Sequence, residues 1–99
     1  MYIIKQTIYF SKWISKLKDI KGKVSIIRRV DRMKMGNFGD YKFVGSDVYE
    51  LKIATGPGYR VYYRKRGSDI IILLVAGDKS TQNSDISKAQ DLAKEYKDG

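Results

Sequence analysis

The order of strand-like and helix-like segments predicts an α+β domain. Residues 2–9, YIIKQTIY, are rich in β-branched and aromatic residues and predict a first strand. Residues 70–76, IIILLVA, form a continuous apolar run that is typical of a strand covered on both faces. Apolar residues recur at helical spacing between these two segments. With no linker or repeat to divide the chain, residues 1–99 are expected to form a single domain.

Two short helices are expected to follow the first strand as a hairpin. The first begins at about Ser11, a plausible N-cap, and carries the apolar stripe Trp13, Ile14, Leu17 and Ile20. Gly22 is read as a break between the helices. The second helix repeats the apolar period at Val24, Ile27, Val30 and Met33 up to Gly36, where a left-handed cap fits.

The remaining residues predict three strands and a final helix. Residues 37–47 read as a loop, 48–53 as a strand, 59–66 as its hairpin partner, and the apolar run follows. The final helix is expected from about Ser84, with Ile86, Ala89, Ala93 and Tyr96 on its apolar side. The predicted order is therefore βααβββα. It gives a mixed, mainly antiparallel four-stranded sheet with the helical hairpin packed on one face.

The hairpin LKIATGPGYRVYYRKR, residues 51–66, separates apolar from basic side chains. Strand alternation places Leu51, Ile53, Tyr59, Val61 and Tyr63 on one face. The opposite face receives Glu50, Lys52, Arg60, Tyr62 and Arg64. Gly56, Pro57 and Gly58 supply the turn. Such a basic face suits a polyanion, although Lys and Arg also serve simply to keep a sheet edge soluble.

Composition favours a nucleic-acid partner. The chain carries 20 Lys and Arg against 11 Asp and Glu, a net charge of +9. Residues 1–40 hold ten of the cations and three of the anions, so the excess lies mainly on the helical hairpin. No apolar run is long enough to span a membrane, and no signal-like segment follows the start. The lack of Cys favours a reducing, cytoplasmic compartment. A charged helix face is nevertheless often only a solvated face.

The absence of two residue types restricts the chemistry. There is no Cys, which excludes disulfides and thiol catalysis, and no His, which removes the usual general base near neutral pH and the commonest zinc ligand. Catalysis would depend on Lys, Arg, Tyr or carboxylates. The carboxylates to consider for magnesium are Asp40, Asp47, Glu50 and Asp78, but their spacing does not indicate a site. No cofactor or metal is therefore expected.

Four segments together resemble a known family. They are FSKWISKLKD at residues 10–19, GNFGD at 36–40, YELKIATGPGYRVYY at 49–63 and GDKSTQNSDISKA at 77–89. In this order and spacing they resemble the HigB-like addiction-module killer proteins of the RelE/ParE toxin superfamily. The resemblance implies the toxin of a type II toxin–antitoxin system, a metal-independent, ribosome-dependent endoribonuclease (mRNA interferase) that inhibits translation. ParE-like members of the superfamily poison gyrase instead.

Site residues follow from matching this sequence to the family pattern. Arg60 matches the Arg of the Gly-Tyr-Arg strand and is expected to clamp the scissile phosphate. Lys52 matches a basic position on the preceding strand, as a base or as electrostatic support, and Lys79 matches a basic site residue after the central strand. The set expected to bind RNA is Tyr62, Arg64, Arg66 and Gln82. Glu50 stands where RelE-type strands have a lysine, and Gln82, Asn83 and Asp85 occupy the region where RelE has a tyrosine.

The resemblance also implies partners. These are mRNA in the ribosomal A site and a cognate helix-turn-helix antitoxin, with operator DNA reached only through the antitoxin. A ParE-like gyrase poison and a non-catalytic nucleic-acid-binding module remain as alternatives. The retained basic set Lys52, Arg60 and Lys79 favours the nuclease over the gyrase poison.

Overall fold

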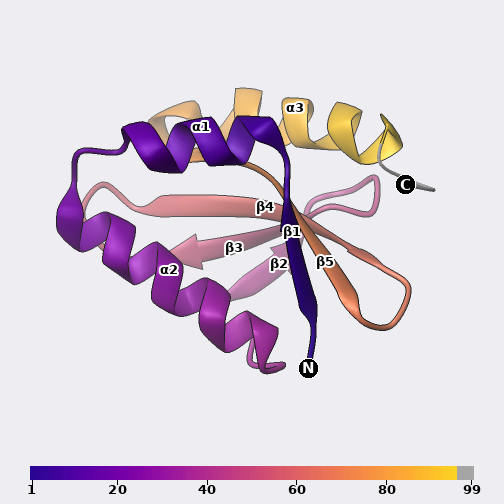
Figure 1. The fold of residues 1–99 in the computed structure, drawn as a ribbon. Helices are drawn as coiled ribbons and strands as arrows, with labels where there is room; N and C mark the ends of the chain where they lie inside the picture. The colour runs from indigo at the N-terminus through magenta and orange to yellow at the C-terminus, as the bar shows by residue number, and fades with distance from the viewer. Residues whose placement is uncertain (96–99) are drawn as a thin grey trace.

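The computed structural model, which describes residues 1–95, has a mixed sheet of five strands in the order β1-β5-β4-β3-β2 (Figure 1). Its strands are β1 (Ile3–Gln6), β2 (Tyr41–Phe43), β3 (Tyr49–Ile53), β4 (Tyr59–Arg66) and β5 (Ile70–Asp78). β1 runs parallel to β5, and the other neighbouring pairs are antiparallel. The α+β class and the mainly antiparallel sheet are confirmed.

The fifth strand corrects the predicted loop at residues 37–47. Tyr41–Phe43 pairs with β3, and the tight connection between them places Ser46 and Asp47 at positive φ values of 53° and 63°. Three exposed residues are too few to show a period in the sequence. β2 is held by pairing with β3 and by the ring contacts of Tyr41 and Phe43 with Tyr49, at centroid distances of 6.1 and 5.4 Å.

The helical hairpin consists of α1 (Ile8–Lys16) and α2 (Ile20–Lys34), and both helices begin earlier than predicted. Thr7 rather than Ser11 caps α1, because its hydroxyl accepts a hydrogen bond from the Phe10 amide. Asp19 caps α2 through the amide of Gly22, which therefore lies inside the helix and does not break it. A side chain at Gly22 would overlap the ring of Tyr59, so this glycine lets α2 approach β4 closely.

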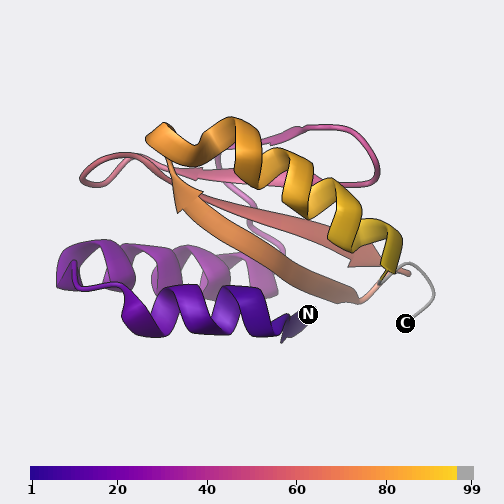
Figure 2. The same ribbon diagram turned by 90° about the horizontal axis from the view of Figure 1, so that it is seen from above.

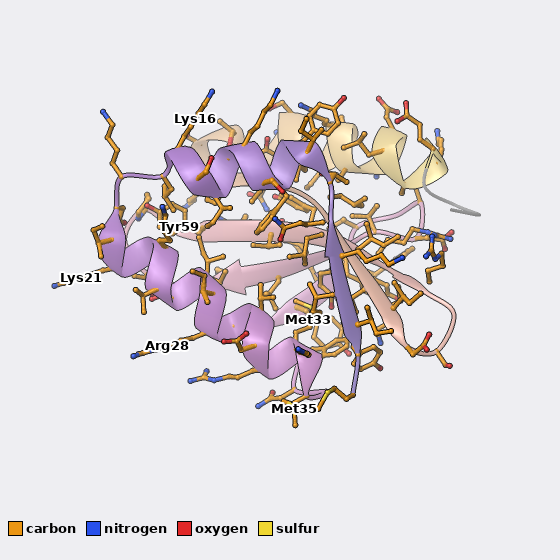
Figure 3. The ribbon with its side chains drawn as sticks, viewed as in Figure 1. Lys16, Lys21, Arg28, Met33, Met35 and Tyr59 are labelled. Carbon is orange, nitrogen blue, oxygen red and sulfur yellow. The ribbon has the colours of Figure 1, made fainter. Side chains whose placement is uncertain are left out.

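Side chains on α2 follow the predicted apolar period only in part: Met33 is buried, but Val24 and Ile27 are 41% and 49% exposed, and Ile26 is buried in their place. Met33 is fully buried against the sheet, whereas Lys21 and Arg28 point outward into solvent (Figure 3). The helix ends where predicted, with Gly36 at φ 92° and its amide bonded to the Met33 carbonyl at 2.9 Å. Trp13 of α1 packs on the same core and meets the ring of Tyr59 edge-on.

The helical hairpin packs on one face of the sheet, as predicted, and the last helix covers the other. Figure 2 shows α1 and α2 on one side and α3 (Gln82–Glu95) on the other. The face under α1 and α2 buries Leu51, Ile53, Tyr59, Val61 and Tyr63, as the alternation predicts. The face under α3 buries Tyr62 with Ala89, Leu92 and Ala93. α3 begins two residues before the predicted cap Ser84, after the 3₁₀ turn Lys79–Thr81, and Tyr96 lies outside the described residues.

Strand β5 contains a β-bulge opposite Tyr62 and Tyr63. Tyr62 pairs with Val75 and Tyr63 with Leu73, so Leu74 is the extra residue, and both Leu74 and Val75 lie in the core beneath α3. The Leu74 carbonyl accepts a hydrogen bond of 2.5 Å from the Thr7 hydroxyl. The residue that caps α1 therefore also satisfies the bulge and ties β1 to β5.

Candidate functional site

A buried polar cluster lies where β3, β4 and the start of α3 meet, with Glu50 at its centre. Oε2 of Glu50 accepts hydrogen bonds from the Tyr62 hydroxyl at 3.1 Å and from Nε2 of Gln82 at 2.9 Å. Two cations complete the surroundings: Nε of Arg60 lies 3.8 Å from Oε2, and Nζ of Lys42 lies 3.8 Å from Oε1. Glu50 is only 2% exposed. A carboxylate with four polar neighbours is a positioned group, not a solubilising one.

Arg60 is held by one hydrogen bond and by its ion pair with Glu50. Its Nη1 donates to the carbonyl of Gly58 at 3.0 Å, which folds the guanidinium back toward the β3–β4 turn. Its Nε is buried and makes no hydrogen bond within residues 1–95. Across the ladder, Arg60 pairs with Lys52 of β3, and Lys52 is exposed. The guanidinium is thus fixed in position where it lines the pocket beside Glu50.

A pocket of about 180 Å³ opens beside this cluster at the β2 edge of the sheet. Its lining residues are Asp40, Tyr41, Lys42, Glu50, Lys52 and Arg60. Three cations face two carboxylates here, so the pocket carries a net positive charge. An anionic ligand would meet the exposed lysines first and the buried guanidinium deeper in the pocket.

Lys79 lies on the exposed 3₁₀ turn that connects β5 to α3. Ladder pairing of Arg60 with Gly77 brings this turn to the same end of the sheet as Arg60. Asp78 caps the turn, and its pKa is lowered by the hydrogen bond from the Ser80 hydroxyl, with a smaller contribution from the charge of Arg60. A charged Asp78 therefore keeps the turn, and with it Lys79, in place.

The structure brings four predicted site residues to this end of the sheet: Lys52, Arg60, Lys79 and Gln82. It does not bring Arg66 there. Arg66 is half-buried and pairs with Ile70 at the far end of β4, six residues and about 20 Å from Arg60 at the usual rise of a strand. Arg64, which was also expected to bind RNA, is buried, with 8% of its surface exposed.

Tyr62, expected to bind RNA, is fully buried beneath α3 and presents no ring face to a base. Burial, followed by the neighbouring Glu50 carboxylate, raises its pKa above the ordinary range, so the phenol stays protonated and donates to Glu50. The expectation of an open polar sheet face is thus corrected. α3 packs on this face and buries Tyr62, and the pocket opens on its β2 side.

Glu50 is the residue that sequence reasoning did not place among the site residues. Its signal was present, because strand alternation puts it on the same face as Lys52 and Arg60. Within residues 1–95, no three acidic side chains gather into a group that could hold a metal ion, so Asp40, Asp47, Glu50 and Asp78 do not converge. In the same range, no helix has the length and apolar character needed to cross a membrane.

Comparison of the chain with protein families shows which family it belongs to. The model of the family described as "Phage derived protein Gp49-like" matches residues 12–97. The chain belongs to this Gp49-like family. A protein of Haemophilus influenzae strain Rd, described as uncharacterized, is 48% identical over 92 residues, which cover 93% of each chain. The Gp49-like match begins within α1 and covers α2, strands β2 to β5 and α3, and therefore includes the whole candidate site.

Solved structures show that this Gp49-like chain shares the fold of E. coli RelE. A free RelE toxin carrying two arginine-to-alanine substitutions superposes with a TM-score of 0.60 at 19% identity, covering 89% of this chain and 93% of RelE. A chain of the intact E. coli RelBE toxin–antitoxin complex superposes with a TM-score of 0.53 at 16% identity, covering 79% of this chain and 96% of that one. At these identities the likeness concerns the fold.

Proposed function

We propose that this Gp49-like protein is the toxin of a type II toxin–antitoxin system that cleaves mRNA on the ribosome without a metal. The observation that carries the proposal is the fixed Arg60 guanidinium beside exposed Lys52 in a positively charged pocket. The RelE-like fold and the net charge of +9 support it. The HigB-like motifs noted above agree with the same activity.

The site supplies groups that metal-free RNA cleavage needs. The 2′-hydroxyl must lose a proton, the phosphorane must be stabilised and the 5′-oxygen must leave. In the proposed mechanism, the Arg60 guanidinium, which lines the pocket, binds the scissile phosphate, and Lys52 at the pocket mouth assists removal of the 2′ proton. Lys79, on the exposed turn, stabilises the charge that develops on the leaving oxygen.

Glu50 has a positioning role in this proposal. It is too enclosed to meet the substrate first, but it touches Tyr62, Gln82 and Arg60 together. Its carboxylate orients the guanidinium and ties the start of α3 to β3. Weak catalysis by such a site in free solution is compatible with the proposal, because positioning of the message by the ribosome supplies part of the acceleration.

An in vitro translation assay followed by primer extension tests the activity. Wild-type protein is expected to truncate the message only when ribosomes are present. Lys52→Gln and Lys79→Gln should each lower cleavage at least tenfold, whereas Lys12→Gln, an equal charge change on exposed α1, should not. Intact messages with wild-type protein, combined with a DNA-damage response in cells, would replace this proposal by the gyrase-poison alternative.

The proposal also includes an antitoxin, with a helix-turn-helix fold, through which the pair reaches operator DNA. A free chain at +9 with an exposed basic pocket needs a mask, and an acidic or amphipathic segment over that pocket would provide one. Affinity purification from the native host should recover a small DNA-binding protein encoded by a neighbouring gene. Growth that is unaffected by expression of the chain alone, with no such protein recovered, would count against the toxin assignment.

A further inference from the structure

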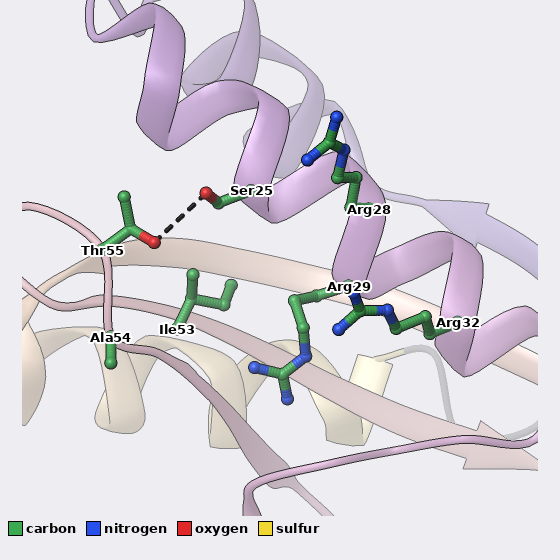
Figure 4. Close-up of a pocket in the computed structure, with 7 residues that line it drawn as sticks. All are labelled: Ser25, Arg28, Arg29, Arg32, Ile53, Ala54 and Thr55. Carbon is green, nitrogen blue, oxygen red and sulfur yellow. Dashed lines mark hydrogen bonds between the residues drawn. The ribbon is translucent and has the colours of Figure 1, made fainter.

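A second basic pocket lies on the other side of β3, beneath α2. Its volume is about 270 Å³, and it is lined by Ser25, Arg28, Arg29, Arg32, Ile53, Ala54 and Thr55 (Figure 4). No acidic residue lines it. Positions 25, 28, 29 and 32 share one helix face because they are three or four residues apart. The pocket therefore brings arginine side chains of α2 to the end of β3, and the guanidinium of Arg28 lies on its outer, solvent-facing side (Figure 4).

Arg29 is held in place inside this pocket. Its Nη1 donates to the Lys52 carbonyl at 2.8 Å, and its Nη2 donates to the Phe38 carbonyl at 3.2 Å. Carbonyl oxygens orient a guanidinium without neutralising its charge, and Arg29 has five N–H donors to share. A Cβ at Gly39 would lie only 2.6 Å from Nη2, so this glycine leaves space for the side chain. Solubility alone would not require such restraint.

The positive charges of the three arginines at this pocket repel each other. Arg28 and Arg32 are four residues apart on the helix, a spacing at which like charges destabilise. Neither of the two ion pairs found within residues 1–95 involves Arg28, Arg29 or Arg32. The hydroxyls of Thr55 and Ser25, which bond each other at 3.1 Å, add polar groups at the rim. An anion with several oxygens would relieve the repulsion and use the free donors.

Lys52 connects the two basic pockets. The carbonyl of Lys52 fixes Arg29, while the Lys52 side chain lines the pocket that contains Arg60. We infer that Arg28, Arg29 and Arg32 form a second phosphate site, which binds a backbone phosphodiester of the same RNA that occupies the Arg60 pocket. The identity of the nucleic acid as RNA rests on the proposed function, but binding of a phosphate group here does not.

A binding experiment with a non-cleavable probe tests this site. A labelled single-stranded 2′-O-methyl RNA is titrated with wild-type protein and with Arg28→Gln/Arg32→Gln at several salt concentrations, and anisotropy is recorded. The matched control is Lys12→Gln/Lys16→Gln, which removes the same charge from exposed positions of α1. Loss of one phosphate contact should lower the salt slope by about 0.7 for a single strand. We expect this reduction and at least a fivefold greater loss of affinity in the arginine variant than in the control.

Equal losses of RNA affinity in the two double variants would overturn the proposed site. They would show that the RNA is attracted by the overall positive charge and not by these arginines. An NMR titration with inorganic phosphate is an independent test of the site. At equal ionic strength, phosphate but not chloride should shift the Nε–Hε resonance of Arg29. An unshifted resonance would also overturn it. If a glutamate-rich peptide, but not the RNA probe, binds in an Arg28- and Arg32-dependent way, the ligand is a protein and the RNA assignment fails.

The probe cannot be cleaved, so this result is separable from the nuclease proposal. A protein without nuclease activity can still show the predicted arginine dependence, and an active nuclease can fail to show it. Circular dichroism of both double variants confirms that each is folded. The arginine variant should be at least as stable as wild type, since it removes a like-charge pair from the helix.

Discussion

Nε of Arg60 lies 3.8 Å from Oε2 of Glu50, and the two side chains are 8% and 2% exposed. Each charge is buried beside the other, so removal of one leaves the other without its compensating charge. Replacing Arg60 therefore perturbs both the proposed phosphate clamp and the fold. Arg60→Lys, which keeps the charge and loses the guanidinium fork, separates these two effects better than Arg60→Ala.

Glu50→Gln should destabilise the protein by about 2 to 3 kcal/mol, because the buried Arg60 loses its charge partner. Urea unfolding measures the change. Lys42→Gln is the matched control: this lysine lies equally far from the carboxylate but is 63% exposed, and its loss should cost less than about 1 kcal/mol. Equal effects of the two substitutions would show that burial of the pair is not what matters.

Gly77→Ala should displace the turn that carries Lys79. A methyl group at this position would overlap the Asp85 carboxylate and approach the Thr81 hydroxyl. We expect a loss of about 1 to 3 kcal/mol, as for other overpacked sites. Adding Asp85→Ala should recover a large part of it, which a double-mutant cycle by urea unfolding will measure. A double variant no more stable than Gly77→Ala contradicts the steric explanation.

Stability should fall steeply in alkali. Burial, then the hydrogen bond to Asp19, raises the pKa of Tyr59 to about 12, and burial raises the pKa of Tyr62 and Tyr63 as well. An unfolded tyrosine titrates near 10, so this contribution is complete below about pH 10 and is lost as the pH rises toward 12. Urea unfolding at stepped pH, with phenolate absorbance, follows it. Tyr59→Phe should flatten the slope; an unchanged slope would exclude Tyr59 as a cause.

Val61→Asp should prevent folding. Val61 has no exposed surface and lies in the core between the sheet and the helical hairpin, where a carboxylate finds no compensating charge. Circular dichroism and gel filtration report the outcome. Lys5→Asp places the same residue at an exposed position of β1 and should fold normally. A folded Val61→Asp protein would mean that the core described around β4 is wrong.

Much of the architecture was predictable because it depends on local periods. Alternation in residues 49–66 assigned Leu51 and Val61 to one face and Glu50 and Arg60 to the other, as the structure has them. Helix starts were less predictable. Thr7 caps α1 where Ser11 was predicted, and Asp19 caps α2 through the amide of Gly22, which was predicted to break the helix.

The sequence by itself determined which side chains share a face, because a strand or helix imposes its own spacing. Only the tertiary structure decided which of those faces remained open. Gln82 reaches Glu50 across 32 positions of the chain, and Arg29 reaches the Lys52 carbonyl across 23. α3 thereby buries Tyr62, and α2 creates an arginine pocket behind Lys52. Burial and charge compensation arise from distant segments packed together, so no local pattern encodes them.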